Sequence, residues 1–554
     1  MLYLLLRLTV SLPPVHVSHF LAILRKECEV DEVRYGDYNQ VGFYLYRNLL
    51  SSISKNFDDD ILGKELSTLF DHEKSMIYQR LCFEELMGIP KKNRLSMCNN
   101  SFLIQDATRV LRKTLQMLIE SIDPTSLDVV LLMTPNPDIT YSLELAFLIK
   151  EKNSSLPIVM LDYYNFDPSA QYFVSFLTGE NWQGNNIEEY LFLDPATPYI
   201  KDKLFELVDY IVYGEGYDFI RKIFKSSKAS IEGIHCKTFS RDGGAINTTC
   251  ASIESEKDKI KVVYSTPVDL DTLPFPDYSE MQRIYETAQL EMSRGCTYRC
   301  IFCERSPYVP NLRFHSPEYI RDLIQEMRKY SFKDFSFFDP AFNTFTPKIS
   351  NILNFLKSEG VYLKYSAQLR PKKTSDEFIQ LMKDTGCYEI GTGFESGDER
   401  ILNDMQKDAS PSIHLDLAKQ IFDHGMHLAP YIVFGFPTDT MESAIRTQDF
   451  VKKLHSISKD FDIGLGWYWW GYIQRLTPEL FPKYGIKVYN LSKLYEDIDN
   501  TSYSVIIPGL AMSFTYTKGM TRKQLTRVLE KWYQLKDELG FPLYAAEPRP
   551  RGMQ

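Results

Sequence analysis

The sequence lacks the features that mark nucleic-acid-binding and membrane-spanning proteins. It has no run of lysine and arginine, and 73 acidic residues against 63 basic ones give a net charge of -10. Binding to nucleic-acid phosphates needs a basic stripe, so we expect no nucleic acid as a partner. No apolar segment reaches the roughly 18 to 20 residues of a membrane-spanning helix, so we also expect no membrane as a partner.

The apolar N-terminus lacks the basic leader of a secretory signal. The segment from Met1 to Val10 carries Arg7 and runs directly into Pro13 and Pro14. A signal peptide would begin with positive charge and continue as an uninterrupted apolar stretch. We therefore expect a buried first strand at residues 2–10.

Cysteine is scarce outside one short segment. Of the 9 cysteines in 554 residues, six stand alone, namely Cys28, Cys82, Cys98, Cys236, Cys250 and Cys387. They provide no second close pair and no Cys/His knuckle for a tetrahedral zinc site. We expect these six to be buried, unpaired thiols, and unpaired thiols favour a reducing cytoplasm.

The remaining three cysteines form a C-x3-C-x2-C triplet at Cys296, Cys300 and Cys303. Chance would place such a triplet in only about a few chains per thousand. Three thiolates on one loop can hold three irons of a cubic iron-sulfur cluster and leave the fourth iron open for chemistry. Structural zinc is the main alternative, but it needs four ligands, which normally arrive as two close pairs. The triplet therefore predicts a [4Fe-4S] cluster.

Apolar periodicity predicts strands alternating with helices from about residue 285 onward. Helices are expected from Ser316-Pro317, at 349–356 before Gly360, at 378–382 before Gly386, and from Ser410-Pro411 to Gly425. Strands are expected near residue 290 and at 335–338, 362–365, 388–394, 429–434 and 462–466. This alternation implies a parallel sheet, either doubly wound or a partial barrel, with the cysteine loop at the carboxyl end of its first strand.

The first 260 residues alternate in the same way, with interruptions. Strands expected at 2–10, 128–133, 158–161 and 210–213 predict a Rossmann-like domain with a helical insertion near 40–125. The predicted organisation is therefore α/β: a Rossmann-like domain at 1–260, a linker at 261–284, a partial (β/α)6 barrel of the TIM type at 285–470, and a small C-terminal region at 471–554.

The cysteine segment resembles the signature of the radical S-adenosylmethionine (SAM) superfamily, in which an aromatic residue such as Phe302 precedes the third cysteine. Five further motifs follow in the order and spacing typical of the cobalamin-associated branch of that superfamily: Phe338-Asp-Pro-Ala-Phe-Asn343, Gln368-Leu-Arg-Pro371, Gly386-Cys387, Gly393-Phe-Glu-Ser-Gly397 and Phe434-Gly-Phe-Pro437. Upstream, residues 127–134, 209–216 and 271–277 resemble the cobalamin-binding domain and linker of the same branch. The resemblance spans most of residues 1–470, apart from 40–125.

Two features depart from that branch. The Asp-x-His-x-x-Gly motif that supplies a histidine ligand to cobalt is absent, and Leu161-Asp-Tyr-Tyr164 replaces the usual Gly-Gly after the fourth strand. Bulky tyrosines there would crowd a corrin, although many members of the branch bind cobalamin without that histidine. The sequence therefore leaves cobalamin open.

The resemblance implies that the three cysteines hold a [4Fe-4S] cluster whose fourth iron is chelated by SAM. One electron then splits SAM and gives a radical that takes hydrogen from an unactivated carbon, so the cofactor carries the difficult chemistry. The resemblance also implies that SAM contacts six further positions, which are Phe302, Asp339, Arg370, Glu395, Gly435 and Pro437.

Each of these six positions has a plainer alternative. Phe302 would meet the adenine through its backbone, or would only pack beside the cluster. Arg370 would clamp the methionyl carboxylate, or would form a surface ion pair. Asp339 would accept from the methionyl amine, or would cap the next turn.

The last three positions lie at strand ends. A carboxylate at Glu395 ends an apolar strand, where it is costly unless hydrogen-bonded, and this favours a cofactor contact over a solvated face. Gly435 and Pro437 are expected to shape a turn that brings backbone close to the adenine.

The expected function is a radical SAM enzyme that modifies an unactivated carbon of a natural-product intermediate or a peptide. With cobalamin the reaction is methylation; without it the reaction is epimerisation, cyclisation or rearrangement. A methylthiotransferase would carry three further cysteine ligands upstream, and a non-catalytic metal-binding protein would not need the barrel motifs. Expected partners are a small-molecule or peptide substrate and a one-electron reductant such as flavodoxin or ferredoxin.

Overall fold

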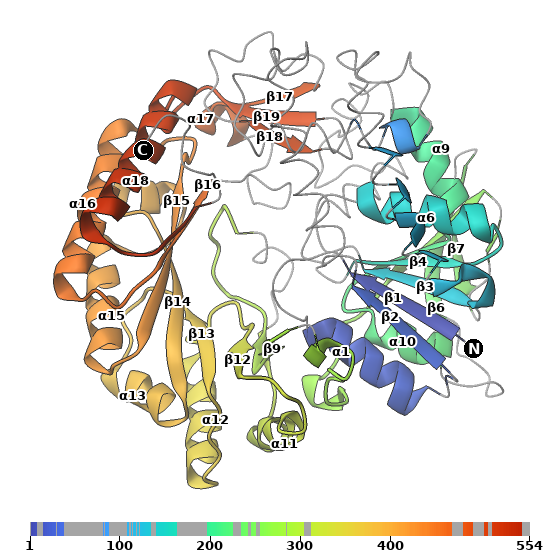
Figure 1. The fold of residues 1–554 in the computed structure, drawn as a ribbon, viewed down its shortest axis with the longest axis horizontal. Coiled ribbons are helices and arrows are strands. Elements are labelled where there is room, and N and C mark those ends of the chain that lie inside the picture. The colour runs from blue at the N-terminus through green and yellow to red at the C-terminus, as the bar shows by residue number, and fades with distance from the viewer. Residues whose placement is uncertain are drawn as a thin grey trace.

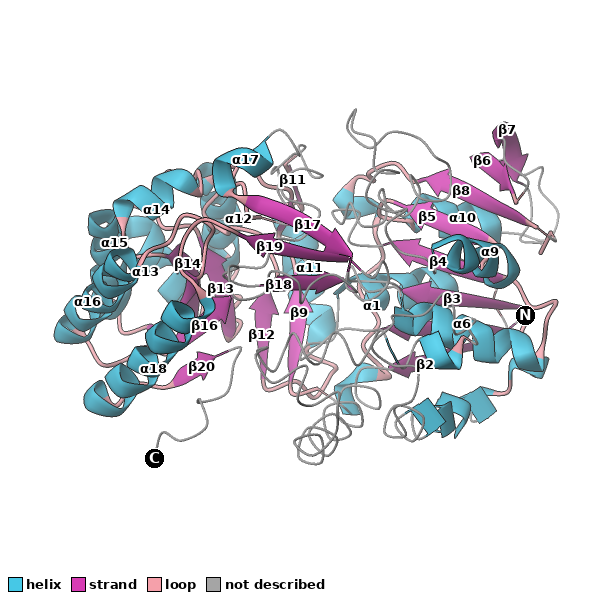
Figure 2. Cartoon of the chain, turned by 90° about the horizontal axis from the view of Figure 1, so that it is seen from above, coloured by secondary structure: helices cyan, strands magenta, loops and turns pink. Residues whose placement is uncertain are grey.

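The computed structural model describes residues 2–7, 15–37 except 29 and 31, 81–87 except 82–83, isolated positions between 108 and 120, 122–133, 140–162, 197–224, 234–303 with breaks at 242–244, 251–254, 257 and 284, 312–467, 480–490, 504–507 and 512–545. Within these residues no helix is both long and apolar enough to cross a bilayer. Two large sheets lie on opposite sides of the molecule, each with helices packed on it (Figure 1, Figure 2). The prediction of an α/β chain with parallel sheets is confirmed.

The N-terminal unit, defined as β1 to β8 with their helices, contains an eight-stranded sheet in the order β2-β1-β3-β4-β5-β8-β6-β7. The six strands from β2 to β8 in that order are parallel, and β6 and β7 form an antiparallel hairpin at one edge. Its strands are β1 (Leu2–Arg7), β2 (Glu32–Asp37), β3 (Val129–Met133), β4 (Ile158–Asp162), β5 (Tyr210–Tyr213), β6 (Ile234–Ser240), β7 (Ala245–Cys250) and β8 (Lys259–Tyr264). Its helices are α1 (Val15–Ala22), α6 (Thr140–Lys152), α9 (Thr197–Leu207) and α10 (Tyr217–Phe224).

The central strands of this sheet are buried along their length, as expected for parallel strands covered on both faces. Val130, Leu131 and Ile158 have no exposed surface, and all four residues of β5 are buried. Helix α1 joins the same core, because the ring of Phe20 lies 4.9 Å from that of Tyr217 on α10. Burial of this apolar surface holds the helices on the sheet.

The C-terminal unit, defined as β9 to β20 with their helices, contains a seven-stranded sheet in the order β20-β16-β15-β14-β13-β12-β9, with every neighbouring pair parallel. Its strands are β9 (Thr287–Leu290), β12 (Asp334–Phe337), β13 (Tyr365–Leu369), β14 (Cys387–Glu395), β15 (His427–Phe434), β16 (Ile463–Trp467) and β20 (Leu543–Ala545). The helices that pack along one face of it (Figure 1) are α11 (Pro317–Met327), α12 (Thr346–Ser358), α13 (Asp376–Asp384), α15 (Pro411–Asp423), α16 (Met441–Ile457) and α18 (Arg522–Leu539).

Helix starts in the C-terminal unit follow the sequence signals. Ser316, Ser375 and Ser410 each accept a hydrogen bond from the backbone N–H three residues later, which satisfies one of the orphan donors of a first helical turn. Pro317 and Pro411 follow two of these caps, where a missing N–H costs nothing. The helices predicted from Ser316-Pro317 and Ser410-Pro411 are therefore confirmed.

The smaller elements connect or extend the two sheets. Strands β17 (Ile486–Asn490), β18 (Ser504–Ile507) and β19 (Met512–Tyr516) form an antiparallel sheet in the order β17-β19-β18. The others are β10 (Ser293–Arg294), β11 (Arg313–Phe314), α14 (Glu399–Asp404), α17 (Phe481–Tyr484), the π-helical turn at Ile23–Glu27 and 3-10 turns at Pro124–Ser126, Leu270–Thr272 and Met281–Arg283.

Four sequence predictions differ from the structure. The strand predicted at 362–365 is wrong, because β13 occupies Tyr365–Leu369, where it aligns with both β12 and β14; pairing with neighbours outweighs the β propensity of the preceding residues. β8 carries the first sheet to Tyr264, past the predicted boundary at 260, and β20 adds a seventh parallel strand to the second sheet. Cys236 is disulfide-bonded rather than a free thiol, so it gives no support to a reducing compartment.

Several predictions lie outside the described residues. They include most of the helical insertion near 40–125 and the tyrosines at 163–164.

Two glycines that follow helices provide a test of the backbone. Gly386 has φ +109°, and a Cβ there would lie 2.0 Å from the carbonyl oxygen of Leu363, whereas Gly360 has φ +65° and its Cβ would meet no atom of the described residues within 4 Å. We expect Gly386→Ala to lower the free energy of unfolding by about 3 kcal/mol and Gly360→Ala by about 1 kcal/mol. Urea denaturation of both variants measures the difference, and equal losses would contradict this assignment.

Candidate functional site

The cysteine triplet follows the carboxyl end of β9, the first strand of the second sheet. After β9 the chain forms β10, turns at Gly295 with φ +107°, and continues into the cysteine loop, defined as residues 295–312. β10 pairs antiparallel with β11 on the far side of this loop, so a two-rung ladder closes its base. Cys300 is buried, and Cys296 and Cys303 are partly buried. The loop therefore presents three thiols from one closed turn of chain.

Arg370 is the principal cation at the cysteine loop. It follows the carboxyl end of β13, and its Nη1 donates a hydrogen bond to Sγ of Cys300 at 3.0 Å. The guanidinium also lies 3.7 Å from the ring centroid of Tyr298, a stacked arrangement that fixes its plane. The side chain of Asn343 donates to the carbonyl of Arg370 at 2.9 Å and accepts from its N–H at 2.8 Å. These two bonds also fix the backbone of the segment after β13 that carries Arg370.

Two cations lie near the thiols and would stabilise an anionic iron-sulfur cluster. Burial raises the pKa of Cys296, and the nearby Arg370 and Lys407 partly oppose that rise. A cluster held by three thiolates carries net negative charge, which two adjacent cations would stabilise. Three cysteines of a cubic cluster bind three different irons, so their sulfurs need not converge on one point.

A mononuclear zinc site does not fit the same residues. In the described part of the chain, no three side chains of His, Cys, Asp or Glu converge closely enough to hold one metal ion. A structural zinc would need four such ligands at bonding distance. The described residues thus offer no four-ligand zinc site.

Glu395 and Lys407 form a buried ion pair beside the cysteine loop. Nζ of Lys407 lies 2.8 Å from Oε1 of Glu395, and both side chains are 8% exposed. Lys407 also lies 5.4 Å above the ring of Phe302. The prediction that Glu395 is not solvated agrees with this burial. Its partner Lys407, between α14 and α15, has no sequence signal, because only the fold brings it to the end of β14.

The backbone at the end of β14 is bent to place this carboxylate. Glu395 has φ +60°, which is uncommon for a residue with a side chain. A Cβ on Gly393 would lie 2.1 Å from Oε1 of Glu395, so only glycine leaves room for the carboxylate to fold back. Strain of this kind persists where the surroundings hold a residue in place, and it is often found at functional sites.

Asp339 holds the segment that leads into the cysteine loop. Its carboxylate accepts from the Met292 N–H at 3.1 Å and from Oγ of Ser293 at 2.5 Å. Burial raises the pKa of Asp339 to about 7 despite these donors. In this arrangement Asp339 joins the end of β12 to the strand before the cysteines.

Gly435 and Pro437 form the turn after β15. Gly435 has φ +79°, and its N–H donates to Oδ2 of Asp439 at 3.2 Å. The carbonyl of Pro437 lies against Gly519, where a Cβ would approach it to 2.7 Å. The structure thus joins this turn to the C-terminal region. Asp439, which the sequence analysis missed, is buried, and burial raises its pKa to about 6.

His414 on α15 is a second residue that the sequence analysis missed. Its ring stacks on that of Phe394 at 4.6 Å, and neither ring nitrogen has a hydrogen-bond partner among the described residues. Burial, together with the charges of Lys407 and Arg370, lowers its pKa to about 3. A neutral histidine therefore backs the strand that ends at Glu395.

Comparison with known proteins identifies the region around the cysteines. Residues 290–451 match the family model described as the radical SAM superfamily. An uncharacterized methyltransferase, PH0819, of Pyrococcus horikoshii is 24% identical over 342 residues, which are 61% of this chain and 69% of that protein. Cytidylyl-2-hydroxyethylphosphonate methyltransferase of Streptomyces wedmorensis is 24% identical over 203 residues, 33% of this chain and 38% of that protein.

A solved structure shares the fold of the whole chain. The radical SAM methyltransferase TsrM from Kitasatospora setae, with tryptophan and a SAM analog bound, has a TM-score of 0.55 at 13% identity and covers 100% of this chain and 92% of its own. Its structure with cobalamin and a [4Fe-4S] cluster bound gives a TM-score of 0.51 at 14% identity, with 88% and 80% covered. At this identity the likeness describes the fold.

The hydrogen bond to Cys300 generates a first prediction. We expect Arg370→Met to lower the reduction potential of a reconstituted cluster by about 50 mV, because loss of a charged donor disfavours the more negative reduced state. An anaerobic redox titration followed by electron paramagnetic resonance (EPR) measures the shift. Lys372→Met, which removes a cation from the same loop, is the control and should change the potential less. Equal potentials in Arg370→Met and wild type would exclude this hydrogen bond from the cluster-bound state.

The buried carboxyl of Asp339 generates a second prediction. Because the pKa of Asp339 rises from 3.8 to about 7 on folding, the folded state binds this proton more tightly than the unfolded state does. The stability that the proton gives is lost as the pH rises through 7. The unfolding free energy of Asp339→Asn minus that of wild type should increase by roughly 2 kcal/mol as the pH rises from 5 to 7, and should increase little more above pH 8. Urea midpoints across this range test it, and a difference independent of pH would refute it.

Proposed function

Because this chain belongs to the radical SAM superfamily, we propose that it is a cobalamin-dependent methyltransferase that acts on an unactivated carbon of a natural-product intermediate or a peptide. The observation that carries the proposal is the relation of the two sheets. The carboxyl end of β5 lies against the base of the cysteine loop, since Glu215 just after β5 pairs with Arg294 on β10 at 3.2 Å. Neighbouring strands of the first sheet run parallel to β5, so their carboxyl ends face the same way.

The first sheet has the strand order of a ligand-binding domain. Its parallel strands run β2-β1-β3-β4-β5, the flavodoxin-like order. Sheets of this order bind ligands outside the carboxyl ends of their strands, at the switch point between β1 and β3. A corrin at that edge would lie between the two sheets, on the side of the cysteine loop.

The second sheet supports a partial barrel whose mouth carries the reaction. Its parallel strands, with helices on one face, are consistent with the predicted partial (β/α)6 barrel, to whose edge β20 adds a seventh strand. The cysteines and Arg370 follow the carboxyl ends of strands, and Glu395 is the last residue of β14, as is usual for barrel active sites. We accordingly interpret residues 1–264, to the end of β8, as the Rossmann-like domain, 265–284 as the linker, 285–470 as the barrel and 471–554 as the C-terminal region, whose β20 pairs with the edge of the barrel sheet.

The names of the similar proteins also support methylation. Both curated relatives named above are called methyltransferases, as is TsrM, whose structures contain cobalamin, a [4Fe-4S] cluster and a SAM analog. The likeness to TsrM extends over the N-terminal unit as well as the radical SAM domain. These facts favour methylation over the cobalamin-independent epimerase, cyclase or mutase.

Residues of this chain would have distinct roles in that reaction. Cys296, Cys300 and Cys303 would hold the cluster, which supplies an electron to SAM, while cobalamin carries the methyl group. Arg370, which donates to Sγ of Cys300, would counter the charge of that thiolate. Lys407 holds Glu395 at the end of β14, where the carboxylate could meet a polar group of SAM. The substrate class, a flavodoxin or ferredoxin reductant and a cytoplasmic location belong to the same proposal.

Reconstitution of the full chain tests the proposal. We expect anaerobically reconstituted protein to contain about four irons, four sulfides and one corrin per chain. Cys296→Ala, Cys300→Ala or Cys303→Ala should each lose most of the iron and all SAM turnover, while Cys387→Ala, which removes a buried thiol from β14, should retain both. Protein that takes up one zinc and no sulfide would contradict the cluster. Protein with a full cluster but no corrin would contradict the methyltransferase.

A further inference from the structure

Two arginines face each other across the base of the cysteine loop. The β10–β11 ladder pairs Arg294 with Arg313, and this two-rung ladder is the neck of the cysteine loop. Side chains opposite each other on antiparallel strands lie about 5 Å apart, and like charges there repel. The neck can therefore stay closed only if an anion lies between or beside the two guanidinium groups.

Glu215 of the N-terminal unit supplies that anion. Its carboxylate lies 3.2 Å from Nη1 of Arg294 and accepts from Nη1 of Arg313, also at 3.2 Å. It accepts as well from the N–H of Val268, in the segment that joins the two units, at 3.0 Å. Glu215 is 5% exposed, so these contacts are shielded from water. One carboxylate thus ties together the first sheet, the connecting segment and both strands of the neck.

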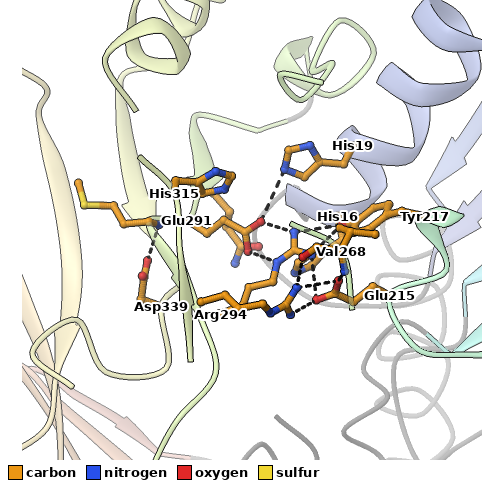
Figure 3. Close-up of polar contacts among 12 residues, drawn as sticks. His16, His19, Glu215, Tyr217, Val268, Glu291, Arg294, His315 and Asp339 are labelled. Carbon is orange, nitrogen blue, oxygen red and sulfur yellow. Dashed lines mark hydrogen bonds and ion pairs between the residues drawn. The ribbon is translucent and has the colours of Figure 1, made fainter. Parts of the chain in front are cut away.

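The remaining contacts of Arg294 complete a buried network (Figure 3). Its Nε donates to Glu291 at 2.8 Å and its Nη2 donates to the hydroxyl of Tyr217 at 3.1 Å. Nδ1 of His16 lies 2.9 Å from the same hydroxyl, and His19 lies 3.6 Å from Glu291. Two arginines are therefore balanced by two glutamates, and removal of either carboxylate leaves excess positive charge in a dry site.

The backbone around Glu215 holds it in place. Gly214 and Gly216 both have positive φ, and a Cβ on Gly214 would lie 2.5 Å from the carbonyl oxygen of Ser265. The N–H of Gly216 donates to Oγ of Ser265 at 2.9 Å. The carboxylate is thus delivered from a fixed turn at the end of β5, and the position of the neck follows the position of the first sheet.

We propose that Glu215 is a positioning residue for the cluster. By clamping Arg294 and Arg313, its carboxylate holds the cysteine loop in the geometry that binds SAM. The inference rests on the proposed function, because it requires a cluster on the three cysteines. It adds that the N-terminal unit takes part in SAM binding through this one carboxylate. Arg294 lies two residues before Cys296, so opening of the neck shifts the first thiolate most directly.

The test compares variants of the full chain after anaerobic reconstitution. Glu215→Gln keeps the shape of the side chain and removes its charge, Glu215→Asp keeps the charge, and Tyr217→Phe removes one contact to Arg294. Asp277→Asn is the matched control, because Asp277 accepts from Arg25 of the N-terminal unit at 2.9 Å in a contact that does not involve the neck. Iron and sulfide content, the unfolding midpoint, and the EPR spectrum of the reduced cluster titrated with SAM are measured for each.

The expected result separates positioning from general stability. Glu215→Gln should retain its iron but require about tenfold more SAM to change the EPR spectrum, with partial recovery in Glu215→Asp and a smaller loss in Tyr217→Phe. Asp277→Asn should lose stability without a change in SAM affinity.

Two outcomes would overturn the inference, and they differ from failure of the proposed function. Glu215→Gln with wild-type SAM affinity would show that the carboxylate only stabilises the fold. Equal losses of SAM affinity in Glu215→Gln and Asp277→Asn would assign the effect to docking of the units in general. A wild-type protein that forms no cluster would contradict the proposed function itself, and this inference with it.

Discussion

Charge buried away from water must be matched by opposite charge at contact distance, because an unpaired ion in a dry site costs several kcal/mol. This constraint governs the region between the two sheets. Arg294 can be buried there only because Glu215 and Glu291 lie against it, and the partly buried Arg313 is paired with Glu215 as well. The constraint extends to the cysteine loop, where Lys407 is matched by Glu395. Partners that meet from different elements fix those elements relative to one another.

Parallel sheets explain why these charges gather where they do. Every strand of the second sheet ends at the same edge, so the residues that follow β9, β12, β13 and β14 meet although they are far apart in sequence. Polar side chains at such an edge do not interrupt the apolar strands behind them. The first sheet brings its own carboxyl edge to the same region through β5, and the pairing of Glu215 with two arginines is one of the contacts there.

Local signals in the sequence were sufficient for much of this arrangement. The cysteine spacing, the capping serines and the 3.6-residue periodicity are properties of short segments, and they predicted the position of the cysteine loop and the helices from Ser316 and Ser410. The burial of Glu395 also followed from its place after an apolar strand. What the sequence did not predict are partners set by tertiary structure: Lys407 for Glu395, the thiol of Cys300 for Arg370, and Glu215 for the neck of the loop. No periodicity or motif links residues that only the sheets bring together.

The glycines on the inner face of the second sheet, away from the helices, differ in how closely other atoms approach them. The carboxylate of Glu395 occupies the space where a side chain on Gly393 would lie. The ring of Tyr431 does the same at Gly464, because a Cβ on Gly464 would approach that ring to 2.8 Å. These two positions are therefore filled by the protein itself. Gly466 differs, because a Cβ there would meet no described atom within 4 Å. It lies near the carboxyl end of β16, beside Val433 in register, at the same edge of the sheet as the cysteine loop, so among the described residues this position would accept a larger side chain.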